Sequence, residues 1–145
     1  MIIKFKDFIE KGCLGKIKTG ISRQEVINLL GEPDDKTQPK ERNPIWKYND
    51  LQVSFRGESL FFIGLYLEQP TLVLPKPLTL DTELHNIRWL DSFKKHLLTE
   101  GIHFSINEKL TFDTQMCLVT NIGVNIIFQD NELDTIQYLN EKIKG

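Results

Sequence analysis

Two stretches of the chain, residues 51–65 and 124–138, resemble each other when they are aligned without a gap. Apolar residues coincide at four positions, which pair Val53 with Ile126, Phe55 with Phe128, Leu60 with Leu133 and Ile63 with Ile136. In each stretch, apolar and polar residues alternate around a polar turn, at 57–58 and at 130–131, and this pattern is typical of β-hairpins. The repetition predicts a duplicated unit. Any two hairpins share such alternation, so chance resemblance is the alternative.

Each hairpin is preceded by a pattern that predicts a helix. Ser22 and Glu25 have the spacing of a capping box, and Gly31 stands where the helix would end. The apolar stripe of this helix is supplied by Val26, Leu29 and Leu30. A second helix is expected over 91–100, and the Gly101 that ends it aligns with Gly31.

The composition of the chain predicts two units joined by a proline-rich segment. The first unit is expected over 1–68 and includes a short N-terminal helix over 3–11, and the second is expected over 89–145. The segment 69–88 between them is expected to be extended, because it contains Pro70, Pro75 and Pro77. Together the units predict one compact α+β domain in which each helix is followed by an antiparallel meander and the helices pack on one face of the sheet.

The overall composition favours a cytoplasmic binding protein. Charged residues make up 26% of the 145 residues, and the formal net charge is -2, which gives no general attraction to nucleic acid or to anionic membranes. The sequence shows neither an apolar run long enough to span a membrane nor a signal-peptide pattern at its start. Cys13 and Cys117 are too few for a disulfide framework, and both are expected to be buried, unreactive thiols.

The two faces of the last strand in each unit are expected to differ. One face is apolar at matched positions in both units and should be the core face, with Ile63, Leu65, Ile136 and Tyr138. The opposite face carries Phe62, Gly64 and Tyr66 in the first unit, but Thr135, Gln137 and Leu139 in the second. Aromatic residues on an open sheet face predict a contact surface. The alternative is that the proline-rich segment or the N-terminal helix covers them.

Trp46 and Tyr48 lie on one face of a predicted strand over 45–48 and pose the same question. Either they extend the aromatic surface of Phe62 and Tyr66, or they belong to the core. Trp and Tyr are enriched in binding hot spots. We therefore assign all four residues as candidate partner-binding residues.

The sequence gives no pattern that predicts catalysis, a metal or a cofactor. His85, His96 and His103 are spaced unlike a tight metal motif. Neither cysteine belongs to a CxxC motif, and the Gly-rich phosphate-binding and nucleophile-elbow motifs do not occur. We therefore expect no catalytic residue, metal site or cofactor, and a protein that is not an enzyme.

The first unit resembles a known family. The stretches that carry the resemblance are Gly20–Val26, Leu29–Pro33, Ile45–Tyr48 and Leu51–Phe55. They resemble the helix-and-meander unit of the outer-membrane assembly lipoproteins of the SmpA/OmlA type, and the tandem arrangement is similar to that of β-lactamase inhibitor proteins. The resemblance implies a protein-binding module with a concave sheet. Cys13 follows no signal peptide, so a lipid anchor is not expected.

These observations together predict a non-enzymatic protein-binding module, and an immunity or inhibitor protein of a bacterial toxin system is the sharpest version of that prediction. The partner is expected to be another protein, or a second copy bound through the same aromatic surface, with the 34–44 loop at its rim. The alternative is a small-molecule-binding protein or a small enzyme with a pocket between sheet and loops. His103, Glu108 and Asp113 would then supply the polar groups of the pocket.

Overall fold

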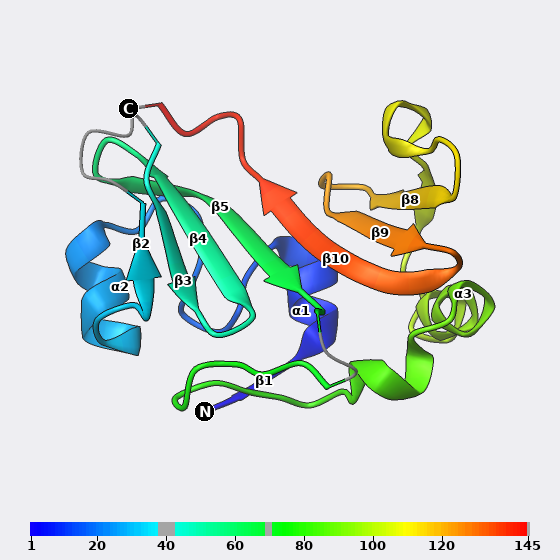
Figure 1. Ribbon diagram of the computed structural model, residues 1–145, viewed down its shortest axis with the longest axis horizontal. Helices are drawn as coiled ribbons and strands as arrows, with labels where there is room; N and C mark the ends of the chain where they lie inside the picture. The colour runs from blue at the N-terminus through cyan, green and yellow to red at the C-terminus, as the bar shows by residue number, and fades with distance from the viewer. Residues whose placement is uncertain (38–42, 69–70, 145) are drawn as a thin grey trace.

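The computed structural model describes residues 1–37, 43–68 and 71–144. Its helices and strands confirm the predicted α+β class (Figure 1). The helices are α1 (Phe5–Lys11), α2 (Arg23–Leu30) and α3 (Leu90–Thr99), with short 3₁₀ helices η1 (Leu84–Ile87) and η2 (Glu108–Leu110). The strands are β1 (Ile2–Ile3), β2 (Asp35–Lys36), β3 (Ile45–Tyr48), β4 (Leu51–Arg56), β5 (Ser59–Tyr66), β6 (Thr79–Leu80), β7 (Phe104–Ile106), β8 (Gln115–Thr120), β9 (Asn125–Gln129) and β10 (Glu132–Leu139).

One antiparallel sheet of eight strands spans both halves of the described chain, in the order β2-β3-β4-β5-β10-β9-β8-β7. The strands before and after the proline-rich segment therefore do not form separate sheets, because β5 and β10 pair at the centre (Figure 1). α2 precedes the four strands on one side of this seam, and α3 precedes the four on the other. A duplicated origin for the two sides stays a prediction.

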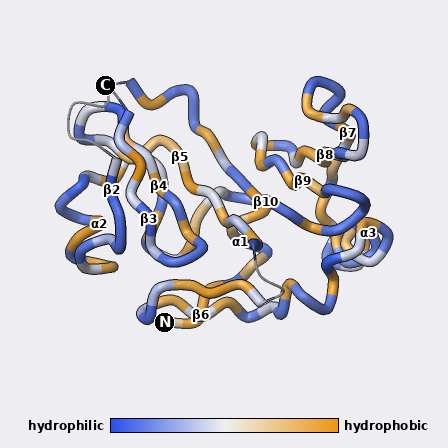
Figure 2. Tube along the Cα trace, viewed as in Figure 1, coloured by the Kyte–Doolittle hydropathy of each residue, from blue (hydrophilic) through white to orange (hydrophobic). Residues whose placement is uncertain are grey.

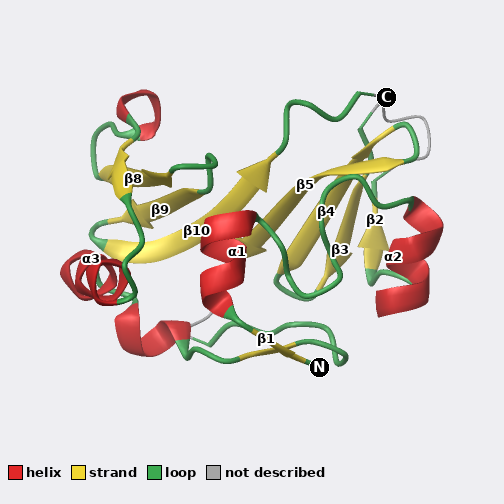
Figure 3. Cartoon of the chain, turned by 180° about the vertical axis from the view of Figure 1, so that it is seen from behind, coloured by secondary structure: helices red, strands yellow, loops and turns green. Residues whose placement is uncertain are grey.

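The helices pack against one face of this sheet, as the alternation of the strands predicted. Figure 3 looks onto that face, with α1 in front of the middle of the sheet. The ring of Phe5 in α1 contacts Phe93 in α3 at a centroid distance of 6.0 Å, and Phe93 contacts Phe128 in β9 at 5.5 Å. α2 is held by Tyr48 of β3, whose hydroxyl donates to the carbonyl of Gly31 at 2.8 Å. Among the described residues, no helix is both long and apolar enough to cross a bilayer.

The beginnings of α1 and α2 follow different rules. The capping box predicted for α2 is confirmed, because Ser22 Oγ accepts the Glu25 N–H and Glu25 Oε1 accepts the Ser22 N–H. α1 starts at Phe5 rather than at residue 3, because Ile2 and Ile3 pair with β6. Its first N–H is bonded by a side chain from the proline-rich segment, at Asp81.

Part of the proline-rich segment forms regular structure, although the sequence predicted an extended linker. Residues 79–80 form β6, which runs parallel to β1, and residues 84–87 form η1. β6 and η1 lie in one arm of the proline-rich segment. The other arm, which precedes β6, is bonded to the turn between β3 and β4, where the Val73 N–H donates to Asp50 Oδ2 and the Asp50 N–H donates to the Val73 carbonyl. The segments around β1 and β6 are largely hydrophobic (Figure 2). The first two residues of the predicted linker, 69–70, lie outside the described residues.

Candidate functional site

The face of the sheet opposite the helices is organised around Gly64 in β5. Strand pairing places Gly64 between Gln52 of β4 and Gln137 of β10. Phe62 and Tyr66 lie on the same face, one position of that face before and after Gly64 along β5, since side chains alternate along a strand. We call these five residues (Gln52, Phe62, Gly64, Tyr66 and Gln137) the Gly64 surface.

The rings of Phe62 and Tyr66 close over the missing side chain of Gly64. A Cβ atom placed on Gly64 would lie 2.8 Å from Cε2 of Tyr66 and 3.0 Å from Cε1 of Phe62. Aromatic rings that cover a strand glycine compensate for the contacts that the glycine lacks. Both rings are half-buried, so each keeps an accessible part on this face. Burial, and after it the Asp134 carboxylate, raises the pKa of Tyr66.

The residues expected at equivalent positions in the last strands of the two predicted units are cross-strand neighbours. Across the seam, Tyr66 pairs with Thr135, Gly64 with Gln137 and Phe62 with Leu139. Thr135 is buried and Leu139 is exposed. The second set therefore lines the same surface as the aromatic residues and does not form a separate solvated face.

This face carries few charges for a chain with 26% charged residues. Its three central rows run across the sheet through Phe62, Gly64 and Tyr66, and within these rows of described residues the charged side chains are those of Lys47 in β3 and of Asp35, its partner in β2 at the margin. The other members of the rows are Ile45, Ser54, Leu139, Gln52, Gln137, Asn125, Val119, Ser105, Thr135, Ile127 and Cys117. Aromatic residues with depleted charge are the compositional signature of an interface core.

A groove of about 800 Å³ adjoins the Gly64 surface and shares Gln137 with it. It lies where β10 runs past the start of β9, between the 121–123 turn and the segment 140–142 that follows β10. Asn125 and Leu139 contribute to its lining. The groove gives this end of the face a concave region beside the flatter aromatic part.

The segments proposed to cover the aromatic residues lie elsewhere. α1 packs on the opposite face, where Thr120 donates to the carbonyl of Ile9. The described part of the proline-rich segment is bonded to β1 and to the 49–50 turn, below the sheet as drawn in Figure 1. In that view neither a helix nor the described part of the proline-rich segment passes in front of β5 or β10. Within the predicted rim loop, 34–44, residues 38–42 lie outside the described residues.

Trp46 and Tyr48 belong to the core and not to this surface. Trp46 is 7% exposed and contacts the ring of Phe55 at 4.6 Å, while Tyr48 is 2% exposed. The register of the hairpin explains this, because its two-residue turn places Trp46 opposite Val53 and Tyr48 opposite Leu51. The same register could have been read from the sequence, since Leu51 and Val53 already marked the core face.

The structure also shows where the two cysteines lie, and where the polar residues lie that were expected to line the pocket of a small enzyme. Cys117 is buried, and burial raises its pKa to about 11, whereas Cys13 is only half-buried, contrary to the prediction that both thiols are buried. His103, Glu108 and Asp113 are all exposed. Within the described ranges, no three His, Cys, Asp or Glu side chains gather closely enough to hold a metal ion.

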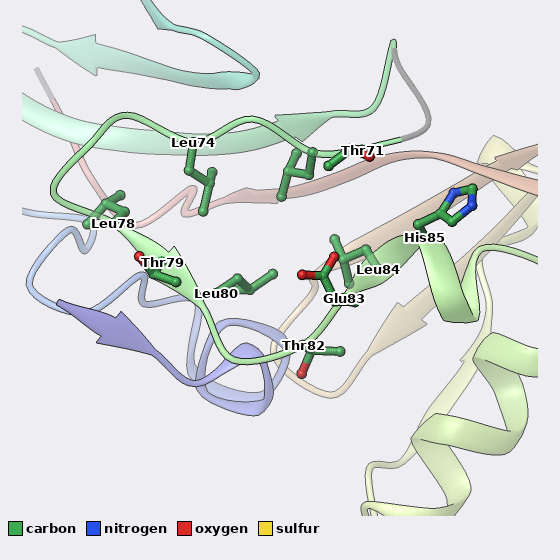
Figure 4. Close-up of a pocket in the computed structure, with 10 residues that line it drawn as sticks. Thr71, Leu74, Leu78, Thr79, Leu80, Thr82, Glu83, Leu84 and His85 are labelled. Atoms are coloured by element: carbon green, nitrogen blue, oxygen red, sulfur yellow. The ribbon is translucent and has the colours of Figure 1, made fainter.

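A second cavity lies between the two arms of the proline-rich segment (Figure 4). It measures about 180 Å³, and its lining includes Leu72, Leu74, Leu78, Leu80 and Leu84. Glu83 and His85 stand toward the η1 end in the close-up, and His85 Nε2 lies 3.3 Å from an Arg88 nitrogen. Pockets for small molecules usually hold about 300–1,000 Å³, so this slot is below the usual size.

No protein-family model, curated protein or solved structure matches this chain. The resemblance to the SmpA/OmlA-type lipoproteins and the β-lactamase inhibitor proteins therefore stays a prediction from the sequence.

Proposed function

We propose that this protein is a non-enzymatic protein-binding module that contacts its partner through the Gly64 surface. The observation that carries the proposal is the pair of half-exposed rings, Phe62 and Tyr66, closed over Gly64 on a sheet face with few charges. A cytoplasmic immunity or inhibitor protein of a bacterial toxin system is the form of this function that we propose.

Three features support a folded protein as the partner. The rings are held against the backbone of Gly64, so little side-chain entropy is lost when they are covered. Gln52 and Gln137 flank Gly64 with side-chain amides, which can both donate and accept hydrogen bonds. The groove beside Gln137 offers a concave site for a protruding segment of the partner. Flat, aromatic and concave parts next to one another are suited to a macromolecular surface.

The experiment is affinity capture from the native lysate, followed by a binding measurement with the purified partner. Gln137→Lys places a charge in the middle of the surface and keeps the cover over Gly64. We expect this variant and the Phe62→Ala/Tyr66→Ala double variant to weaken binding by about tenfold to a hundredfold, as hot-spot losses do. Isothermal titration calorimetry gives the dissociation constants.

Two matched controls separate binding from folding. Val73→Ala removes an exposed apolar side chain outside the surface, and Thr114→Lys adds the same charge at an exposed position outside it. Both should bind the partner as the wild type does, and circular dichroism should show that every variant is folded. If Gln137→Lys and the double variant bind as tightly as the controls, the partner does not use this surface.

A further inference from the structure

The β7 edge of the large sheet leaves backbone groups unpaired. Asn107 donates its N–H to the carbonyl of Cys117 at 2.9 Å, which fixes how β7 bonds to β8. Bonded residues alternate along an antiparallel ladder, so Ser105 bonds to β8 while Phe104 and Ile106 direct their N–H and C=O groups away from it. Among the described residues, no backbone bond from another segment reaches those outward groups.

The two edges of the sheet differ in character. The β2 edge consists of Asp35 and Lys36, and a short, charged strand is one of the devices that block pairing between sheet edges. The β7 edge carries no charged residue, and Ile106, which points to the same face as Leu118, is 46% exposed. An uncharged edge with exposed apolar side chains is open to strand addition.

We propose that a second copy of this chain pairs with β7 through its own β7, antiparallel about a two-fold axis at Ser105. In this register Phe104 of each copy lies opposite Ile106 of the other, and their outward N–H and C=O groups bond in both directions. The outward groups are placed symmetrically about Ser105, so the strand is complementary to itself. A register centred on Phe104 or Ile106 matches fewer of them.

The side chains agree with this register. An aromatic residue opposite a β-branched residue is a stabilising cross-strand pair, and Phe104 of one copy would cover the exposed Ile106 of the other. One step further out, His103 falls opposite Asn107, so no like charges meet. Ser105 points to the opposite face and stands directly across from its own counterpart.

The position of Ser105 on the axis gives a test by charge complementation. Ser105 is exposed, so Ser105→Lys and Ser105→Glu change the monomer little. The wild type should sediment, over a concentration series, toward twice the 16.9 kDa mass of the chain. Each variant alone should dimerise more weakly than the wild type, by about tenfold or more, because like charges then face each other. An equal mixture of the two variants should recover dimerisation.

Ser92→Lys makes the same substitution at an exposed position of α3 and should dimerise as the wild type does. The proposal is overturned if the wild type stays monomeric across the series. It is also overturned if both Ser105 variants dimerise as the wild type does, or if their mixture dimerises no better than either variant alone. The assay uses the isolated chain and changes only residues outside the Gly64 surface, so its result is separate from that of the affinity capture.

Discussion

The Phe5 backbone N–H donates to Asp81 Oδ1 at 2.9 Å, across 76 residues of sequence. Asp81 therefore acts as the N-cap of α1, although Lys4 occupies the cap position of that helix and makes no side-chain cap bond. The same Asp81 oxygen accepts the Thr82 hydroxyl, and the Asp81 N–H donates to the carbonyl of Ile3. The proline-rich segment thus sets the start of a helix that covers the middle of the sheet.

Asp81→Ala should destabilise the protein by about 1 kcal/mol, which is the usual cost of losing an N-cap side chain. Asp81→Asn keeps an oxygen acceptor, so its cost should be a few tenths of a kcal/mol, roughly the difference between good caps. Urea unfolding followed by circular dichroism measures both. Equal losses from the two substitutions would show that the charge, and not the cap bond, holds α1.

Thr120→Val should destabilise the protein more strongly. The buried Thr120 hydroxyl donates to the Ile9 carbonyl at 3.1 Å and accepts the Val124 N–H at 3.2 Å. Valine keeps the shape but leaves both backbone groups unpaired, so we expect a loss of about 2–3 kcal/mol. Thr99→Val, at an exposed position on α3, is the control and should change the free energy of unfolding little. A cost for Thr120→Val no larger than that of the control contradicts this role.

Gly64→Val should displace the rings of the Gly64 surface. Its Cβ would lie 2.8 Å from the Tyr66 ring, and overpacking of this kind costs roughly 1–3 kcal/mol. The near-ultraviolet circular dichroism spectrum should change because the aromatic environment changes. Gln52→Val introduces the same side chain on the neighbouring strand, where a Cβ already exists, and should leave that spectrum intact. An unchanged spectrum for Gly64→Val would mean that the rings do not rest on the glycine.

Tyr48 should make the protein less stable at alkaline pH. Burial, followed by the charges of Glu32 and Asp34, raises the pKa of Tyr48 above its ordinary value of 10.0. Above pH 10 the unfolded chain loses the phenol proton while the folded chain keeps it, so the free energy of unfolding falls as the pH rises. Below pH 10 both states keep the proton, and this effect is absent.

Tyr48→Phe tests this dependence. At pH 7 the variant should be less stable by about 1 kcal/mol, because the bond to the Gly31 carbonyl is lost. Between pH 9 and 11 its stability should fall less steeply than that of the wild type, so the two curves converge. Urea unfolding at a series of pH values gives both curves. Parallel curves would show that Tyr48 titrates alike in the folded and unfolded states.

Local patterns predicted much of the fold. The capping box at Ser22, the strand alternation over 51–56 and the core face with Ile63 and Ile136 are present as expected. These features depend on neighbours within a few residues, which the sequence displays directly.

Distant pairings could not be predicted in the same way. Nothing near Phe5 indicates that its N–H is bonded by Asp81, and nothing near Gln137 indicates that it lies beside Gly64. Both depend on the register between segments far apart in sequence, which the alternation of either segment alone does not specify. The sequence therefore predicted only part of the Gly64 surface: it indicated the two aromatic residues but not the two glutamines.

The seam between β5 and β10 also sets an order of events during synthesis. β5 emerges from the ribosome well before β10, its partner at the centre of the sheet. At about 5–20 residues per second, the interval between the ends of the two strands is roughly 4–15 s. Throughout that time the longest strand of the N-terminal half has one side unpaired. Until its last strand closes the sheet, the nascent chain therefore carries an unpaired strand edge at β5, and such an edge is a template for pairing with other chains.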